Sequence, residues 1–139
     1  LDVGSGAGLP GIPLAVARPE WEFTLLDSNG KKTRFMTHAA GRLGLDNVRI
    51  ARARVEDYAD EIGFDTVISR AFSSLADFVQ RAGHLCSERG CLLAMKGRLH
   101  DEEMATVPAG WGISTTTRLS VPGVKGRRHL VVMTRNGRH

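Results

Sequence analysis

The chain has 139 residues, of which 42% are hydrophobic and 24% charged, with a formal net charge of +4 and an isoelectric point near 9.6. This length and composition are typical of one globular domain. No stretch approaches the roughly 18 apolar residues of a membrane span, and no signal-peptide pattern is seen, so we expect a cytoplasmic protein. The positive charge suggests a polyanionic partner, although many basic proteins bind none.

The chain contains two cysteines, Cys86 and Cys91. Their spacing matches no metal motif, and disulfides are rare in a protein without a secretory signal. We therefore expect two free thiols, buried or half-buried, and no metal site.

The most informative stretch is Leu1–Gly11, which is typical of a strand end, a glycine-rich loop and a helix start. Its glycines let the backbone turn sharply and approach a ligand closely, while the N–H groups of the following helix point at the same place. This pattern predicts a loop that binds a nucleotide cofactor. The expected contacts in the loop are Gly4, Ser5, Gly6, Gly8 and Leu9.

Two kinds of cofactor fit such a loop. The spacing of Gly6, Gly8 and Gly11 satisfies the dinucleotide fingerprint. However, the carboxylate of Asp2 would repel the two phosphates of a dinucleotide and attract the ammonium and sulfonium groups of S-adenosylmethionine. The sequence therefore favours S-adenosylmethionine. The alternative for Asp2 is that it only stabilises the turn through the backbone.

Helices and strands alternate along the rest of the chain. Helices are expected over residues 11–18, 28–43, 74–83 and 101–107, and strands over residues 22–27, 47–51, 64–69, 91–95, 111–121 and 129–134. With the strand before the glycine loop, these elements predict an α/β fold. Its sheet is Rossmann-like, doubly wound and seven-stranded, mostly parallel with an antiparallel last strand.

The second helix is expected to begin at Ser28 or Asn29 and to end at Gly44. Two stripes run along it at spacings of three and four. The apolar stripe, which we expect to be buried, contains Phe35, Met36, Ala39, Ala40 and Leu43. The basic stripe, a solvated face or alternatively an RNA track, contains Lys31, Arg34, His38 and Arg42.

Candidate cofactor residues follow two further strands. Asp27 ends the second strand some twenty residues past the loop, where a carboxylate can accept hydrogen bonds from two ribose hydroxyls, and Ser28 follows it. An alternative role for Asp27 is to stabilise a helix N-terminus. Val55 and Glu56 follow the third strand and are candidate adenine contacts, or alternatively ordinary loop residues.

Basic residues follow the later strands, at the edge where ligands bind in this architecture. Arg70 comes after the fourth strand, where neither an Asn-Pro-Pro-aromatic box nor a Pro-Cys pair is present. Its planar guanidinium suits a carbonyl-rich base, although a surface salt bridge is the alternative. Lys96 comes after the fifth strand, and residues 122–128 form a basic, glycine-rich loop.

Together these segments closely resemble the ribosomal RNA small-subunit methyltransferase G family, also called glucose-inhibited division protein B. The resemblance covers nearly the whole chain. Its most specific parts are Leu-Pro-Gly-Ile-Pro at residues 9–13, which continues the glycine loop, and Ser-Arg-Ala-Phe at residues 69–72, here called the box at residues 69–72. The segments that carry it are 2–14, 26–32, 54–56, 64–65, 69–72, 96–97 and 128–131.

The resemblance implies methylation of ring nitrogen 7 of one guanine in 16S ribosomal RNA, with S-adenosylmethionine as donor. It implies that Arg70, Lys96 and Arg128 position the base, with Arg70 also near the cofactor. It further implies RNA contacts by Arg54, Lys125, Arg127 and Arg128. The partner would be 16S ribosomal RNA or a precursor of the small ribosomal subunit, bound by a monomer. Alternatives are another S-adenosylmethionine-dependent enzyme acting on a small molecule, or an RNA-binding module without catalysis.

Only three residues precede the first glycine, whereas a central strand normally has five or six. The family also carries a helical segment before this strand. We therefore expect residues 1–139 to be a single methyltransferase domain that is truncated at its N-terminus, poorly stable and weakly active alone.

Overall fold

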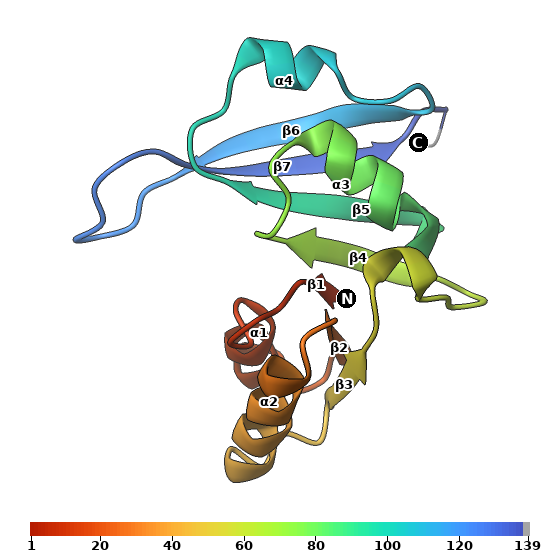
Figure 1. Cartoon of the computed structure of the whole chain (residues 1–139). Coiled ribbons are helices and arrows are strands. Elements are labelled where there is room, and N and C mark those ends of the chain that lie inside the picture. The colour runs from red at the N-terminus through yellow and green to blue at the C-terminus, as the bar shows by residue number, and fades with distance from the viewer. Residues whose placement is uncertain (138–139) are drawn as a thin grey trace. The chain divides into compact units, whose positions relative to one another are not determined.

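The structure is a computed structural model that describes residues 1–137 (Figure 1). The chain divides into two compact units, Leu1–Tyr58 and Ala59–His139. None of the helices within the described residues combines the length and apolar composition that a membrane span needs.

The first unit contains three parallel strands in the order β3-β2-β1. These are β1 (Asp2–Val3), β2 (Phe23–Asp27) and β3 (Val48–Arg52), with helices α1 (Gly11–Ala17) and α2 (Gly30–Arg42) and the 3-10 turn η1 (Val55–Asp57). Leu25 is fully buried between α1 and α2 in a cluster with Ile12 and Met36. Because Val3 pairs with Leu26 and Asp27 with Arg52, the carboxyl ends of all three strands meet at one edge.

Helix α2 shows why its N-cap was predictable and its apolar stripe was not. The Asn29 side chain accepts hydrogen bonds from the backbone N–H groups of Lys31 and Lys32, so Asn29 is the cap and not Ser28. Met36 and Ala40 are buried as expected, and Ala39 is half-buried.

The expected burial of Phe35 and Leu43 is wrong, since they are 53% and 57% exposed. Phe35 lies about 100° around the helix from Met36, and Leu43 lies beyond the last helical residue, where the chain turns into Gly44 with a φ of +64°.

The second unit contains four strands in the order β4-β5-β7-β6. They are β4 (Phe64–Ser69), β5 (Cys86–Lys96), β6 (Trp111–Leu119) and β7 (Arg128–Arg135), with α3 (Leu75–Ala82), the 3-10 turn η2 (Gly83–Leu85) and α4 (Asp101–Ala105). β4 and β5 are parallel, whereas β7 is antiparallel to both β5 and β6. This confirms the seven strands and the reversed last strand expected from the sequence.

Strand β5 begins five residues earlier than expected. The pairing with β4 jumps from Phe64–Cys86 to Thr66–Cys91, so β5 carries an irregular segment that no period-two pattern indicates. Arg135 supports this segment by donating from Nη2 to the carbonyl oxygens of Gly83 at 3.1 Å and Cys86 at 2.8 Å. Cys86 is buried and Cys91 half-buried, and both are free thiols, as predicted.

Candidate cofactor loop and basic surface

The glycine loop after β1 is closed by backbone contacts. Gly4, Gly6 and Gly8 have φ values of +67°, +60° and +85°, which side-chain-bearing residues rarely adopt. The N–H groups of Gly4 and Ser5 donate to the carbonyl oxygen of Leu26 at 2.9 and 3.1 Å. The loop is therefore attached to the neighbouring strand β2.

Asp2 holds the two ends of this loop together. The residue is 2% exposed, and its Oδ2 accepts hydrogen bonds from Ser5 Oγ at 2.7 Å and from the backbone N–H of Gly11 at 2.9 Å. A Cβ atom at position 11 would lie 2.9 Å from the same Oδ2 and 2.8 Å from the Leu25 side chain, so only glycine fits. These contacts are those of the loop-stabilising alternative, and any cofactor contact of Asp2 stays a prediction.

Asp27 is fixed at the same edge by two backbone groups. The N–H of Gly6 donates to its Oδ2 at 3.0 Å, and the N–H of Asn29 donates to its Oδ1 at 2.9 Å. The residue is half-buried, and each carboxylate oxygen has a second lone pair that can accept another hydrogen bond. Asp27 is thus oriented and still accessible to a ligand with hydroxyl groups. Ser28 beside it is exposed.

The outer side of the loop has room for a ligand. A Cβ placed on Gly6 would have its nearest neighbour, the Gly4 carbonyl oxygen, 3.9 Å away. Gly4 and Leu9 are exposed, Leu9 by 42%. At the same edge η1 carries a half-buried Val55 and an exposed Glu56, one residue after the exposed Arg54. The first unit therefore brings its predicted cofactor residues to one edge, where the oriented Asp27 carboxylate can accept hydrogen bonds from hydroxyl groups.

In the second unit, the turn after β4 exposes Arg70. The hydroxyl of Ser69, which is 3% exposed, accepts a hydrogen bond from the Ala71 N–H at 2.9 Å. The Phe72 ring stacks on Phe78 of α3 with centroids 5.1 Å apart. Ser69 and Phe72 are thus held by contacts within the second unit, while Arg70 and Ala71 between them are exposed.

Lys96 lies in a different environment from the other predicted basic residues. Its side chain is only 12% exposed and its Nζ lies 2.8 Å from both the Ser73 carbonyl oxygen and the Glu103 carboxylate. Glu103 was not predicted from the sequence, although the three acidic residues of the short α4 helix were a signal for a nearby cation. The structure therefore does not present the Lys96 ammonium at the surface.

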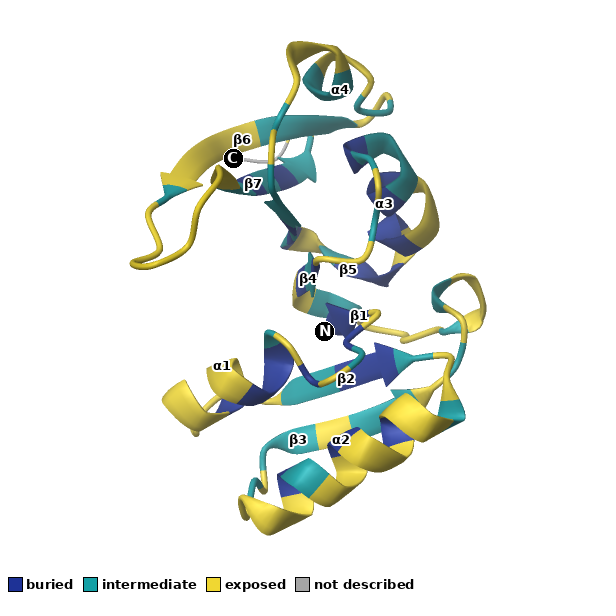
Figure 2. Cartoon of the chain, turned by 60° about the vertical axis from the view of Figure 1, so that its left-hand side comes forward, coloured by how far each residue is buried: buried dark blue, intermediate teal, exposed yellow. Residues whose placement is uncertain are grey.

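Two of the predicted RNA contacts share a basic pocket of about 450 Å³. Arg98, Arg127 and Arg128 line it with two glycines, Gly97 and Gly126, and no acidic residue. The ring Nδ1 of His129 lies 2.6 Å from the Gly97 carbonyl oxygen and links β7 to the turn after β5. Arg98 was not predicted from the sequence. Lys125 is exposed on the loop between β6 and β7, where residues 121–128 are all exposed (Figure 2).

Comparison with known proteins identifies relatives of nearly the whole chain. The family described as rRNA small subunit methyltransferase G matches residues 1–131. A ribosomal RNA small subunit methyltransferase G of Nitrosococcus oceani is 58% identical over 131 residues, which are 94% of this chain and 61% of that relative. The chain thus spans about three fifths of the relative's length.

Solved structures show the same fold at low sequence identity. TrmN from Thermus thermophilus has a TM-score of 0.76 at 18% identity, over 96% of this chain and 42% of its own. M. jannaschii TYW2, solved in complex with AdoMet, has a TM-score of 0.70 at 18% identity, over 96% of this chain and 67% of its own. The class I methyltransferase fold expected from the sequence is confirmed, and the matched residues show that the chain belongs to the ribosomal RNA small subunit methyltransferase G family.

Proposed function

We propose that this chain transfers a methyl group from S-adenosylmethionine to ring nitrogen 7 of a guanine in 16S ribosomal RNA. The protein would act in the cytoplasm as a monomer, with residues 1–139 serving as one methyltransferase domain. The observation that carries the proposal is the carboxylate of Asp27, which Gly6 and Asn29 orient beside an open glycine loop. Membership of the family supports the choice of RNA as substrate.

The first unit would bind the cofactor. Bound S-adenosylmethionine supplies an electrophilic methyl group on a sulfonium. Asp27 would accept hydrogen bonds from the ribose hydroxyls, and the buried negative charge of Asp2 would favour the cationic methionine end while bracing the loop. The remaining proposed contacts are Gly4, Ser5, Gly6, Gly8 and Leu9 to the methionine end, Ser28 beside the ribose, and Val55 and Glu56 at the adenine.

The reaction requires little acid–base chemistry from the protein. Nitrogen 7 of guanine has a free lone pair and no proton, so no general base is needed to activate it. The rate would come from holding the lone pair, the methyl carbon and the sulfur in line. Arg70 is suited to fixing the base because its guanidinium is exposed on a turn that Ser69 and Phe72 hold in place.

Other basic residues would have distinct roles. Arg54, Lys125, Arg127 and Arg128 are exposed and would contact RNA phosphates, with Arg128 also near the base. We assign Lys96 a positioning role, because its ammonium holds the Ser73 carbonyl oxygen three residues after Arg70.

The test is mass spectrometry of 16S ribosomal RNA from a strain lacking the gene, complemented with the wild-type gene or with Asp27→Ala. The methylated guanine should disappear in the deletion strain, return with wild type and stay absent with Asp27→Ala. Calorimetry on the purified proteins should show S-adenosylmethionine binding only for wild type. If the methylation of 16S ribosomal RNA is the same in all strains, the small-molecule alternative is supported. RNA binding without cofactor binding would support the non-catalytic alternative.

A further inference from the structure

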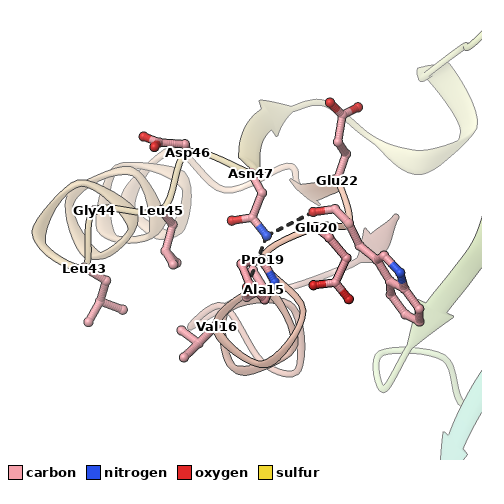
Figure 3. Close-up of a pocket in the computed structure, with 11 residues that line it drawn as sticks. Ala15, Val16, Pro19, Glu20, Glu22, Leu43, Gly44, Leu45, Asp46 and Asn47 are labelled. Carbon is pink, nitrogen blue, oxygen red and sulfur yellow. Dashed lines mark hydrogen bonds between the residues drawn. The ribbon is translucent and has the colours of Figure 1, made fainter.

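A pocket of about 510 Å³ lies in the first unit, between the end of α1 and the turn that follows α2 (Figure 3). It is lined by parts of residues 15–22 and 43–47, the segments that precede β2 and β3. The predicted cofactor residues follow the strands β1, β2 and β3. Because these strands are parallel, the pocket lies at the opposite edge from the glycine loop.

Asn47 makes the base of this pocket stiff. Its Nδ2 donates to the carbonyl oxygens of Ala15 at 3.1 Å, Arg18 at 3.1 Å and Trp21 at 3.0 Å. One side chain therefore fastens the end of α1 and the turn before β2 to the start of β3. The base of the pocket is therefore held by contacts within the fold.

The pocket exposes large apolar side chains to solvent. Val16, Trp21 and Leu43 are 55%, 56% and 57% exposed. In Figure 3 the side chains of Val16, Leu43 and Leu45 point toward the same space between the two helices. A cluster of this kind on a polar surface is typical of a protein contact.

The charge of the pocket is opposite to that of the chain. Glu20, Glu22 and Asp46 line it without any Lys, Arg or His, whereas the chain carries a net charge of +4. All three carboxylates are exposed, so they would repel RNA phosphates. The complementary guest has cationic side chains beside aliphatic ones.

Arg18 shows within the chain how such a cation binds here. Its guanidinium lies 5.1 Å from the Trp21 ring centroid and 3.7 Å from the Glu20 carboxylate. Trp21 and Glu20 thus already form a cation site at the pocket, in which Arg18 would compete with a guest arginine or lysine.

We propose that this pocket docks a basic, amphipathic segment of another protein. Aliphatic side chains of the segment contact Val16 and Leu43, and its Lys or Arg side chains pair with Glu20, Glu22 and Asp46. This contact is separate from methyl transfer and would attach the enzyme to a basic protein at the edge opposite the glycine loop.

The test uses a synthetic helical peptide with leucines on one face and lysines on its flanks, followed by backbone amide NMR of the protein. Addition of the peptide should shift the amides of residues 15–22 and 43–47. Charge reversal of Glu20, Glu22 and Asp46 to Lys should weaken binding about tenfold or more, since several exposed ion pairs are lost. Arg18→Ala should strengthen binding, a gain that structural damage would not produce.

The control variant is Glu61→Lys, which reverses an exposed acid of the second unit and should leave the affinity unchanged. Equal binding of a matched peptide with glutamates in place of lysines would overturn the proposal, as would shifts elsewhere in the chain. The proposal would also be overturned if RNA produced the same amide shifts. The same shifts on raising the protein concentration alone would mean that a second copy of the chain occupies the pocket, which would overturn it too.

Discussion

The two units present their candidate functional residues in different ways. In the first unit the carboxylate of Asp2 accepts hydrogen bonds from Ser5 and Gly11, and that of Asp27 accepts them from Gly6 and Asn29. In the second unit Arg70 and Arg127 are exposed on loops, and Arg128 is exposed at the start of β7. Lys96 is the exception, since its ammonium is enclosed by Glu103 and Ser73.

This difference suits two different ligands. A small cofactor of fixed shape binds best to a preorganised site, because little conformational freedom is lost on binding. A polyanion is attracted mainly by charge, which does not need fixed side chains. If the two units have these separate roles, changes at the glycine loop should weaken cofactor binding, and changes at the exposed arginines should affect the RNA substrate.

The largest effect is expected for Asp2→Ala. Removing the buried carboxylate leaves the Gly11 N–H and the Ser5 hydroxyl without their acceptor and removes a negative charge beside the cofactor. S-adenosylmethionine binding should weaken by roughly 2–5 kcal/mol. Calorimetry measures this, and Ser5→Ala, which removes one of these hydrogen bonds and a proposed cofactor contact but keeps the charge, should weaken binding less. Unchanged affinity in Asp2→Ala, or tight binding of a dinucleotide, would contradict the assignment.

Replacement of Arg70 should separate the two units' functions. Arg70→Ala is expected to lower single-turnover methyl transfer by about a hundredfold while cofactor affinity stays near wild type, because the lost contacts are to the base. Arg70→Lys keeps the charge without the planar fork and should recover only a small part of the activity. Full turnover in Arg70→Ala would show that the box at residues 69–72 has been misassigned.

Disruption of the Lys96–Glu103 pair should mainly lower the free energy of unfolding. The two side chains are 12% and 14% exposed, so Glu103→Gln leaves a nearly buried ammonium with one carbonyl partner. We expect a loss of about 2 kcal/mol in the free energy of unfolding. Chemical denaturation measures it, and the exposed neighbour Glu102→Gln is the matched control. If Glu103→Gln is as stable as wild type, Lys96 is free to serve the substrate directly.

The elements that the sequence predicted well depend on local signals. The glycine loop, the Asn29 cap and the strands ending at Asp27 and Ser69 are each specified by neighbours in the chain. The placement of the candidate cofactor residues at one edge of the first unit was predictable to the same extent, since residues at the ends of parallel strands gather there.

What the sequence did not reveal depends on contacts between side chains and groups of other elements of the fold. Glu103 pairs with Lys96 across a turn, Arg135 holds carbonyl groups near residue 85, and Asn47 fastens three carbonyl groups some 26 to 32 residues away. Sequence periodicity does not identify the group with which a charged or amide side chain interacts. The exposure of Phe35 is of the same kind, because the width of a helix's buried face is decided by what it packs on.

A smaller effect is expected from the loop between β6 and β7. Neutralising Lys125 and Arg127 to Gln should weaken RNA binding without changing cofactor affinity. The slope of log affinity against log salt concentration should flatten by about 0.7 for each lost contact to a single-stranded phosphate. Filter binding at several salt concentrations measures this. An unchanged slope would mean that the exposed charges of this loop do not touch RNA.

The smallest effect is expected on the pH dependence of stability, through a thiol in the interior of the second unit. If this interior is packed as tightly as the region around the glycine loop, water does not reach the thiol. Burial raises the pKa of the Cys86 thiol from 9.0 to about 11, against the opposing influence of Arg135. In the unfolded chain the thiol ionises near its ordinary pKa of 9.0. The stability that the buried, protonated thiol contributes to the folded protein is therefore fully present below pH 9.0 and is lost as the pH rises toward about 11. At a pH of about 10 the free energy of unfolding should be lower by about 1 kcal/mol than at neutral pH.

Other groups titrate in the same range, so the measurement is the difference in unfolding free energy between wild type and Cys86→Ala at both pH values. A difference that does not change with pH would mean that water reaches this thiol and that the interior of the second unit is looser than the region around the glycine loop.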